Sequence, residues 1–190
     1  MTLSQNYSYL SPEAYLDAEK DSPQKHEYIQ GRIYAMAGAS DAHVTITANL
    51  VALLRNHIRG TGCRVYVTDM KARIEQLNIF YYPDVMVTCD ERDRNLDYYK
   101  RYPCLIIEVL SDGTEAFDRG DKFADYSELE TLKEYVLINQ KRMRAERFCR
   151  DAEGQWVLYR YKEGDELKLD SVDFRCSMAA VYEDVLLALK

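Results

Sequence analysis

The sequence predicts one domain, residues 1–190, of the α/β class: an α+β arrangement with a central mixed sheet, flanking helices and a C-terminal antiparallel meander. Three observations predict it. Helical and strand-like runs alternate along the first three quarters of the chain. The run Leu105–Leu110 is almost wholly apolar, as in a strand covered on both faces. Three polar-apolar alternating runs then follow one another closely near the C-terminus.

The chain begins with a capped helix and a hairpin. Ser11-Pro12-Glu13 combines a Ser cap, a Pro at the first helical position and an acid in the first turn, which predicts a helix to about Asp21 or Ser22. Residues 25–37 alternate and turn at Gly31, which predicts a strand pair. Residues 38–41 then cap a helix of residues 42–59 with a broad apolar stripe.

The middle of the chain carries the expected sheet. A charged, tyrosine-rich loop is expected at residues 90–102, and a helix at residues 115–129. That helix would expose Asp118, Lys122 and Tyr126 four residues apart on one face. Strands are expected at residues 63–67, 69–75, 80–89, 104–110 and 134–139.

The C-terminal part predicts a meander and a last helix. Short turns around Gly154 and Gly164 separate three alternating runs, which favours antiparallel strands. The runs are residues 142–150, 155–161 and 166–169. Residues 179–190 are expected to form a short amphipathic helix.

Charge and cysteine content limit the function classes. The net charge of −7 argues against a surface for indiscriminate nucleic-acid binding, although it allows a local basic groove. The sequence has no long apolar run and no apolar signal core at its start, so we expect no membrane partner and a cytoplasmic location. The five dispersed cysteines are interpreted as small buried apolar residues and not as a disulfide framework or zinc site.

Two acidic residues stand in otherwise apolar strands. Asp84 follows Pro83, and Glu108 interrupts Leu105–Leu110. A lone carboxylate is costly to bury, and two of them side by side suit Mg²⁺ or Mn²⁺, with the backbone carbonyl of Val109 as a further ligand. Such a site can polarise a phosphoryl oxygen. Lys122 could orient a water and offset developing charge, and Glu27 is a further acid for the site.

Several segments together resemble the PD-(D/E)XK nuclease superfamily, and within it a bacterial branch of restriction-endonuclease-like proteins, the Uma-type family. The resemblance rests on His26-Glu27-Tyr28, Tyr82-Pro83-Asp84-Val85 and Ile107-Glu108-Val109-Leu110-Ser111, in this order along most of the chain. It also uses Gly38-Ala39-Ser40 with His43, and Thr114, Asp118, Lys122 and Tyr126. The chain departs from the superfamily at Leu110, where the motif has a lysine. In the Uma-type branch that lysine has moved to the following helix.

The resemblance implies a restriction-endonuclease-like fold and Mg²⁺-dependent hydrolysis of DNA. It implies that Asp84 and Glu108 ligate the metal, that Glu27 supports them and that Lys122 replaces the strand lysine. We assign His43, Lys71 and Arg73 to substrate binding. Homodimers are common among such proteins, and two-fold symmetric sites suit duplex DNA.

Other interpretations remain open. Asp84 could be a turn residue, Glu108 could pair with a structural Arg or Lys, and Lys122 could be a solvated helix residue. Glu27 could be a surface acid and His43 a helix cap. The basic run of residues 141–150 could be a solvated face or a strip that binds a nucleic-acid backbone. The whole chain could also be a catalytically weak nuclease-fold module that binds nucleic acid or protein.

Overall fold

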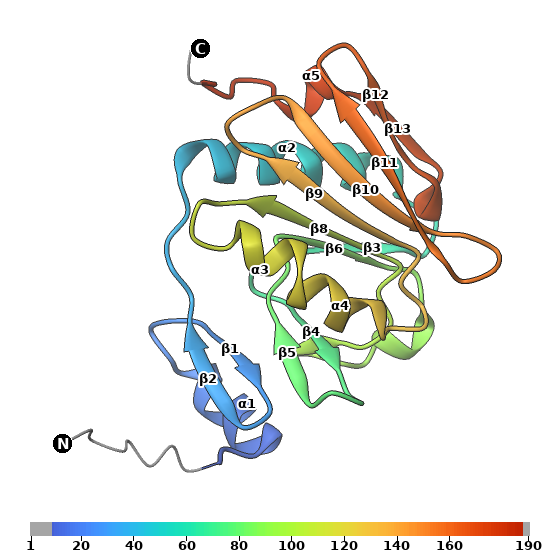
Figure 1. Cartoon of the computed structure of the whole chain (residues 1–190). Helices are drawn as coiled ribbons and strands as arrows, with labels where there is room; N and C mark the ends of the chain where they lie inside the picture. Colours follow the sequence, from blue (N-terminus) through green and yellow to red (C-terminus); the bar gives the residue numbers. More distant parts are fainter. Residues whose placement is uncertain (1–8, 188–190) are drawn as a thin grey trace.

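A six-stranded mixed sheet forms the centre of the computed structural model, which describes residues 9–187 (Figure 1). Its strand order is β11-β10-β9-β8-β6-β3. β8 and β9 are parallel, and every other neighbouring pair in this sheet is antiparallel. The strands are β3 (Arg64–Val67), β6 (Val85–Thr88), β8 (Leu105–Leu110), β9 (Glu134–Asn139), β10 (Arg144–Arg150) and β11 (Trp156–Lys162).

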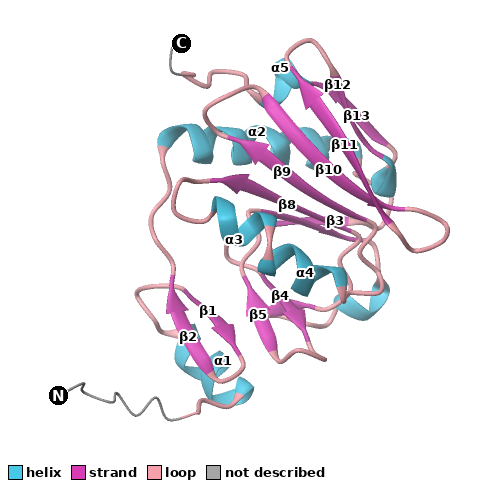
Figure 2. Cartoon of the chain, in the orientation of Figure 1, coloured by secondary structure: helices cyan, strands magenta, loops and turns pink. Residues whose placement is uncertain are grey.

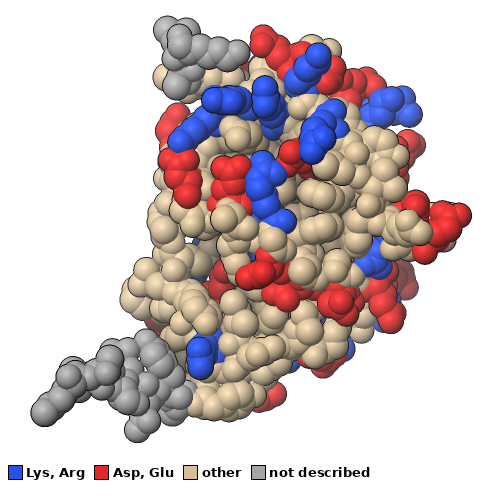
Figure 3. Space-filling model, in the orientation of Figure 1, with Lys and Arg blue, Asp and Glu red and all other residues tan. Residues whose placement is uncertain are grey.

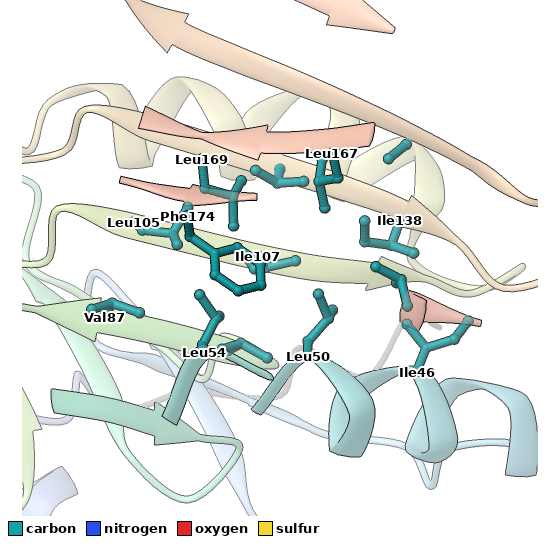
Figure 4. Close-up of a cluster of buried hydrophobic side chains, with 14 of the residues drawn as sticks. Ile46, Leu50, Leu54, Val87, Leu105, Ile107, Ile138, Leu167, Leu169 and Phe174 are labelled. Atoms are coloured by element: carbon teal, nitrogen blue, oxygen red, sulfur yellow. The ribbon is translucent and has the colours of Figure 1, made fainter. Parts of the chain in front are cut away.

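Helices cover both faces of this sheet, as the apolar run of β8 predicts (Figure 2). On one face, α2 (Asp41–His57) packs Ile46, Leu50 and Leu54 against alternate residues of β8 (Figure 4). On the other face lie α3 (Glu115–Arg119) and α4 (Asp121–Ser127). Because side chains alternate along a strand, Glu108 shares the α3–α4 face with Ile106 and Leu110.

A second sheet packs below α4 and has the order β2-β1-β5-β4-β7. It consists of β1 (His26–Ile29), β2 (Arg32–Ala35), β4 (Lys71–Ile74), β5 (Ile79–Tyr81) and β7 (Tyr99–Lys100). Helix α1 (Pro12–Lys20) lies against it through Tyr15, which stacks on Tyr28. Residues of this sheet and of α4 share one apolar cluster, so α4 lies between the two sheets.

The helix starts and the hairpin are confirmed by their local chemistry. The Ser11 hydroxyl accepts the N–H of Ala14, and the Ser40 hydroxyl accepts the N–H of His43. The hairpin turn places Gly31 at φ +90°, a conformation that favours glycine.

The predicted strand of residues 80–89 is wrong as a single element. The chain leaves β5 at Tyr81 and enters β6 at Val85, so one run supplies strands to two different sheets. Tyr82-Pro83-Asp84 forms the break between them. A proline cannot donate to a strand ladder, which is consistent with a break at this point.

Three further expectations need correction. The helix of residues 115–129 is divided at Gly120, whose φ and ψ of −110° and −101° are not helical. β12 (Glu166–Leu169) pairs with β13 (Phe174–Ser177) in a separate two-stranded sheet and does not extend the meander. The last helix, α5 (Met178–Val181), has four residues only. Residues 188–190 of the predicted helix lie outside the described residues. Two 3₁₀ turns complete the inventory, at Glu91–Asp93 and Asp170–Val172.

The cysteine interpretation is wrong for one pair. Cys63 and Cys89 form a disulfide. The β3–β6 register places Arg64 opposite Thr88, so the next residues outward, Cys63 and Cys89, face each other. Cys104, Cys149 and Cys176 are free thiols. None of the helices in the described chain is both long and apolar enough to cross a bilayer.

Candidate active site

Asp84 and Glu108 meet because β6 and β8 are paired in register. Val85 lies opposite Ile107, which places Asp84 opposite Glu108. The Asp84 N–H donates to Glu108 Oε2 at 3.2 Å, and the Val109 N–H donates to Asp84 Oδ2 at 2.7 Å. The expectation that these two carboxylates converge therefore agrees with the geometry.

Lys122 extends from the first turn of α4 into a group of acids. Its Nζ lies 3.0 Å from Glu108 Oε1, 3.2 Å from Glu27 Oε1 and 3.6 Å from Asp118 Oδ1. The Lys122 side chain is 7% exposed. It is therefore a buried member of the cluster and not a solvated helix residue.

Elements from both sheets and both helical layers supply the cluster. Glu27 comes from β1 of the second sheet, and its Oε1 accepts the N–H of Tyr82 at 3.4 Å. Asp118 comes from α3 and Tyr126 from α4. The Tyr126 hydroxyl donates to Glu108 Oε1 at 3.3 Å, which fixes the orientation of that carboxylate. The expected exposed face of a single helix is wrong, because the helix divides at Gly120 and the side chains of Asp118, Lys122 and Tyr126 are all buried at this cluster.

His43 reaches the site from the first turn of α2. Its Nε2 lies 2.9 Å from Asp84 Oδ1, and both side chains are 14% exposed. Capping at Ser40 fixes the start of α2 and hence the position of this imidazole. The sequence analysis predicts His43 as a substrate contact but does not predict Asp84 as its partner. The two residues are 41 positions apart and belong to different elements, so no local pattern links them.

Burial makes the acid cluster electrostatically unusual. Desolvation raises the pKa of Glu108 well above its usual value, and Asp84 and Asp118 add to the rise, while Lys122 opposes it. For Lys122, burial favours the neutral amine, but Glu108, Glu27 and Asp118 together raise its pKa well above its usual value. The ammonium form is therefore the stable one.

The donor chemistry fits a hard divalent cation. Asp84 and Glu108 offer carboxylate oxygens at one place. The Val109 N–H points to Asp84, and in an extended strand the carbonyl of the same residue points to the same side. The Val109 carbonyl therefore lies on the Asp84 side of β8, where it can serve as a third oxygen ligand.

A second group of ligand atoms lies elsewhere. Glu134, Cys149 and Asp170 bring one ligand atom each to within 4.8 Å of the others. The Arg147 guanidinium already lies there, 3.3 Å from Glu134 and 2.9 Å from Asp170. This arrangement is an ion-pair cluster with a cation of its own.

The other two predicted substrate contacts lie on β4 of the second sheet. Lys71 is 6% exposed, and its Nζ lies over the ring of Tyr82. The Arg73 guanidinium donates to Asn78 Oδ1 and stacks on Phe80. Both side chains thus make internal contacts, and their assignment to substrate stays a prediction.

Comparisons with known proteins identify the family of this chain. Residues 12–179 match the model of the family Uma2, described as "Putative restriction endonuclease". The Synechocystis protein slr1290, called uncharacterized, is 39% identical over 173 residues, which cover 91% of each chain. A second Synechocystis protein, sll1609, also called uncharacterized, is 37% identical over 151 residues. The match covers 78% of this chain and 85% of sll1609.

A solved structure shows the same fold. It is described as a "putative nuclease belonging to DUF820" from Anabaena variabilis, and it superposes with a TM-score of 0.73. The match covers 90% of this chain and 98% of the other, at 15% sequence identity. The likeness therefore concerns the fold.

Proposed function

Since the chain belongs to the Uma2 family of putative restriction endonucleases, we propose that it is a cytoplasmic, metal-dependent endonuclease that hydrolyses phosphodiester bonds of DNA. The proposed site comprises Asp84, Glu108 and Lys122, with Glu27 in support. One observation carries the proposal: three acids converge on one buried ammonium group, and a fourth acid, Asp84, lies against Glu108.

The charge balance of the cluster favours a divalent cation. The cluster contains four acids, Glu27, Asp84, Glu108 and Asp118, and the single ammonium group of Lys122. A buried excess of negative charge is costly unless it is paired. A Mg²⁺ or Mn²⁺ ion would offset two of the excess charges, and its preferred ligands are those present.

Asp84, Glu108 and the Val109 carbonyl would hold the ion. Bound there, Mg²⁺ would polarise a phosphoryl oxygen of the substrate and acidify a water molecule. The Val109 N–H and the Tyr126 hydroxyl hold the two carboxylates in place, so little reorganisation is needed.

Lys122 and Glu27 would act beside the ion. Lys122 keeps its proton because three acids surround it, so its ammonium group can orient a water and offset charge that develops on the phosphoryl group. Glu27 holds the Lys122 ammonium at 3.2 Å from the other sheet. Of the predicted substrate contacts, His43 is at the site and could contact a phosphate once Asp84 binds the ion.

Cleavage of supercoiled plasmid with Mg²⁺ or Mn²⁺ tests the proposal. We expect activity that requires the ion and that falls by at least about 100-fold in Asp84→Asn. The exposed Asp97→Asn carries the same substitution away from the cluster and should retain activity. Equal activity of Asp84→Asn and wild type would remove Asp84 from the mechanism.

We also propose that the protein is a homodimer. A homodimer would linearise plasmid without accumulating nicked circles.

Metal uptake separates this proposal from a module that only binds. Calorimetric titration of the folded wild type with Mn²⁺ should give a saturable heat that Asp84→Asn loses. A folded protein that takes up no divalent ion at millimolar concentration would favour the binding module.

A further inference from the structure

A groove of about 670 Å³ opens at the C-terminal ends of β8 and β9. Leu110 and Leu137 form its floor, α3 forms one wall, and the start of β10 with the end of β11 forms the other. The groove is therefore built on the α3–α4 face of the sheet, the same face that carries Glu108.

The groove is rich in cations in an acidic protein. Six Lys or Arg residues line it against four acids, although the whole chain has 25 basic and 32 acidic residues. Lys and Arg side chains gather over the upper part of the face in Figure 3, where the meander lies.

Contacts within the groove satisfy the acids and part of the cations. Arg119 Nε lies 2.8 Å from Glu115 Oε1, and the same guanidinium contacts Glu146. Lys141 Nζ lies 2.7 Å from Asp112 Oδ2. Asp165 accepts the backbone N–H of Lys162 at 2.8 Å.

Three exposed cations that line the groove have no acidic partner among residues 9–187. They are Arg142, Arg144 and Lys162. Arg144 and Lys162 are also direct cross-strand partners in the β10–β11 pair, which places like charges opposite each other. Such a pair is destabilising by itself, and a bound anion would relieve the repulsion.

The groove adjoins the acid cluster across one short helix. In α3, Asp118 faces Lys122, whereas Glu115 and Arg119 face the groove. Along β8, Leu110 in the groove is two residues from Glu108 and points to the same face. The groove and the acid cluster therefore lie on the same face of the sheet, on either side of α3.

We propose that this groove binds the phosphodiester backbone of the nucleic acid beside the scissile phosphate, with Arg142, Arg144 and Lys162 as its contacts. The inference rests on the proposed function and names the surface that positions the substrate. The contacts are to phosphates, so they supply affinity and register without reading sequence.

A second cross-strand pair of like charge lies outside the groove and serves as a control. Lys168 and Arg175 are also exposed cross-strand partners of like charge, on β12 and β13. They do not line the groove. Like-charge pairing alone therefore does not define the surface, and this second pair provides the control.

The experiment compares two triple variants in the binding of labelled DNA, duplex in one arm and single-stranded in the other. The groove variant is Arg142→Ala, Arg144→Ala, Lys162→Ala. The control, Lys168→Ala, Arg175→Ala, Arg32→Ala, removes the same charge from exposed positions. All proteins carry Asp84→Asn, which prevents cleavage during the measurement. Fluorescence anisotropy over a range of salt concentrations gives the affinity and its salt dependence.

We expect the groove variant to bind duplex more weakly and to lose about one unit of salt slope for each phosphate contact removed. The control should behave like its parent. Equal DNA binding by the groove variant and the control would overturn the proposal that the groove binds the phosphodiester backbone. Whichever arm shows the larger difference between the two variants identifies the form of nucleic acid that the groove fits.

A small substrate separates this inference from the proposed function. With Asp84 restored, Mn²⁺-dependent hydrolysis of bis(p-nitrophenyl) phosphate depends on the acid cluster and not on the groove. The groove variant should hydrolyse it at the wild-type rate. DNA binding that depends on the groove, without any hydrolysis, would contradict the proposed endonuclease activity and support the proposed binding groove. Hydrolysis together with DNA binding that does not depend on the groove would support the activity and contradict the binding groove.

Discussion

Two buried glutamates on neighbouring parallel strands have opposite environments. Glu134 of β9 accepts the N–H groups of Asp170 and Ser171 and the Ser171 hydroxyl, and it pairs with Arg147. Glu108 of β8 shares one ammonium group with Glu27 and Asp118 and lies against Asp84. Both side chains are almost completely buried. Burial of an acid therefore does not by itself identify a functional site.

The difference lies in what remains uncompensated. At Glu134, hydrogen-bond donors fill the carboxylate, and the guanidinium of Arg147 balances the charge. Burial favours a lower pKa for Arg147, but Glu134 and Asp170 outweigh it and raise that pKa. At Glu108, acids outnumber the available cation. Proximity of ligand atoms distinguishes the Glu134 group, whereas charge balance distinguishes the Glu108 cluster.

The largest expected effect is the loss of catalysis in Glu108→Gln. If the uncompensated cluster is the site, this variant should lose at least about 100-fold in Mg²⁺-dependent DNA cleavage, because a ligand is lost. Glu134→Gln should cleave at close to the wild-type rate. Plasmid cleavage at matched protein concentration measures both. Equal losses in the two variants would remove the distinction between the clusters.

For the free energy of unfolding, we expect the larger effect at Glu134 and the smaller effect at Glu108. Glu134→Ala leaves a buried guanidinium with Asp170 alone and should lower the free energy of unfolding by about 3–5 kcal/mol. At about pH 4.5, where burial keeps Glu108 protonated, Glu108→Gln replaces one neutral side chain by another and should change metal-free stability by less than about 1 kcal/mol. Urea unfolding measures both. The exposed Glu130→Ala should stay within about 0.5 kcal/mol of wild type.

Local sequence patterns predict several features of the two clusters. Contacts between segments that are distant in the sequence cannot be predicted in this way. The spacing of Lys122 and Tyr126 follows from the helical period of α4, whereas the break at Gly120 places Asp118 on a different helix. The near-continuous apolar strand predicted a sheet covered on both faces. The approach of Glu27 from a different sheet, and of His43 to Asp84, depends on packing that no local period encodes.

Errors in the predicted elements have the same origin. An alternating run does not reveal its partner strand, so the sequence predicts β12 as part of the meander although it pairs with β13. The apolar run through Tyr82-Pro83-Asp84 favoured one strand, while the missing N–H of Pro83 is consistent with two. The Cys63–Cys89 disulfide follows from the β3–β6 register, which the sequence alone does not give.

A smaller effect should appear in the pH dependence of stability. Burial raises the pKa of Glu108, so the folded protein retains a proton that the unfolded chain releases. This contribution is full below the unfolded pKa of about 4.3 and is lost as pH rises above that value. With metal removed by a chelator, stability should therefore fall with rising pH by at most about 1.4 kcal/mol per unit.

The variant Glu108→Gln should lose that component of the slope, because it has no proton to release. Glu130→Gln leaves Glu108 in place and should retain it. Urea unfolding between pH 4.5 and the neutral range measures the slope, within the window set by the about 4.3 reference value. An identical slope in wild type and Glu108→Gln would show that Glu108 does not hold this proton.

The smallest expected effect concerns Cys149, the soft ligand atom of the Glu134 group. If that group is an ion pair with its own cation, Cys149→Ser should leave both Mn²⁺ uptake and DNA cleavage unchanged. Burial raises the pKa of the Cys149 thiol, which disfavours the thiolate that a metal would need. Stability should change by less than about 1.5 kcal/mol, because the side chain is only half-buried and its volume is conserved. Calorimetric titration with Zn²⁺, which prefers sulfur ligands, is the most sensitive measurement. A Zn²⁺ site lost on Cys149→Ser would mean that Arg147 can be displaced, and the two clusters would then differ only in the metal they select.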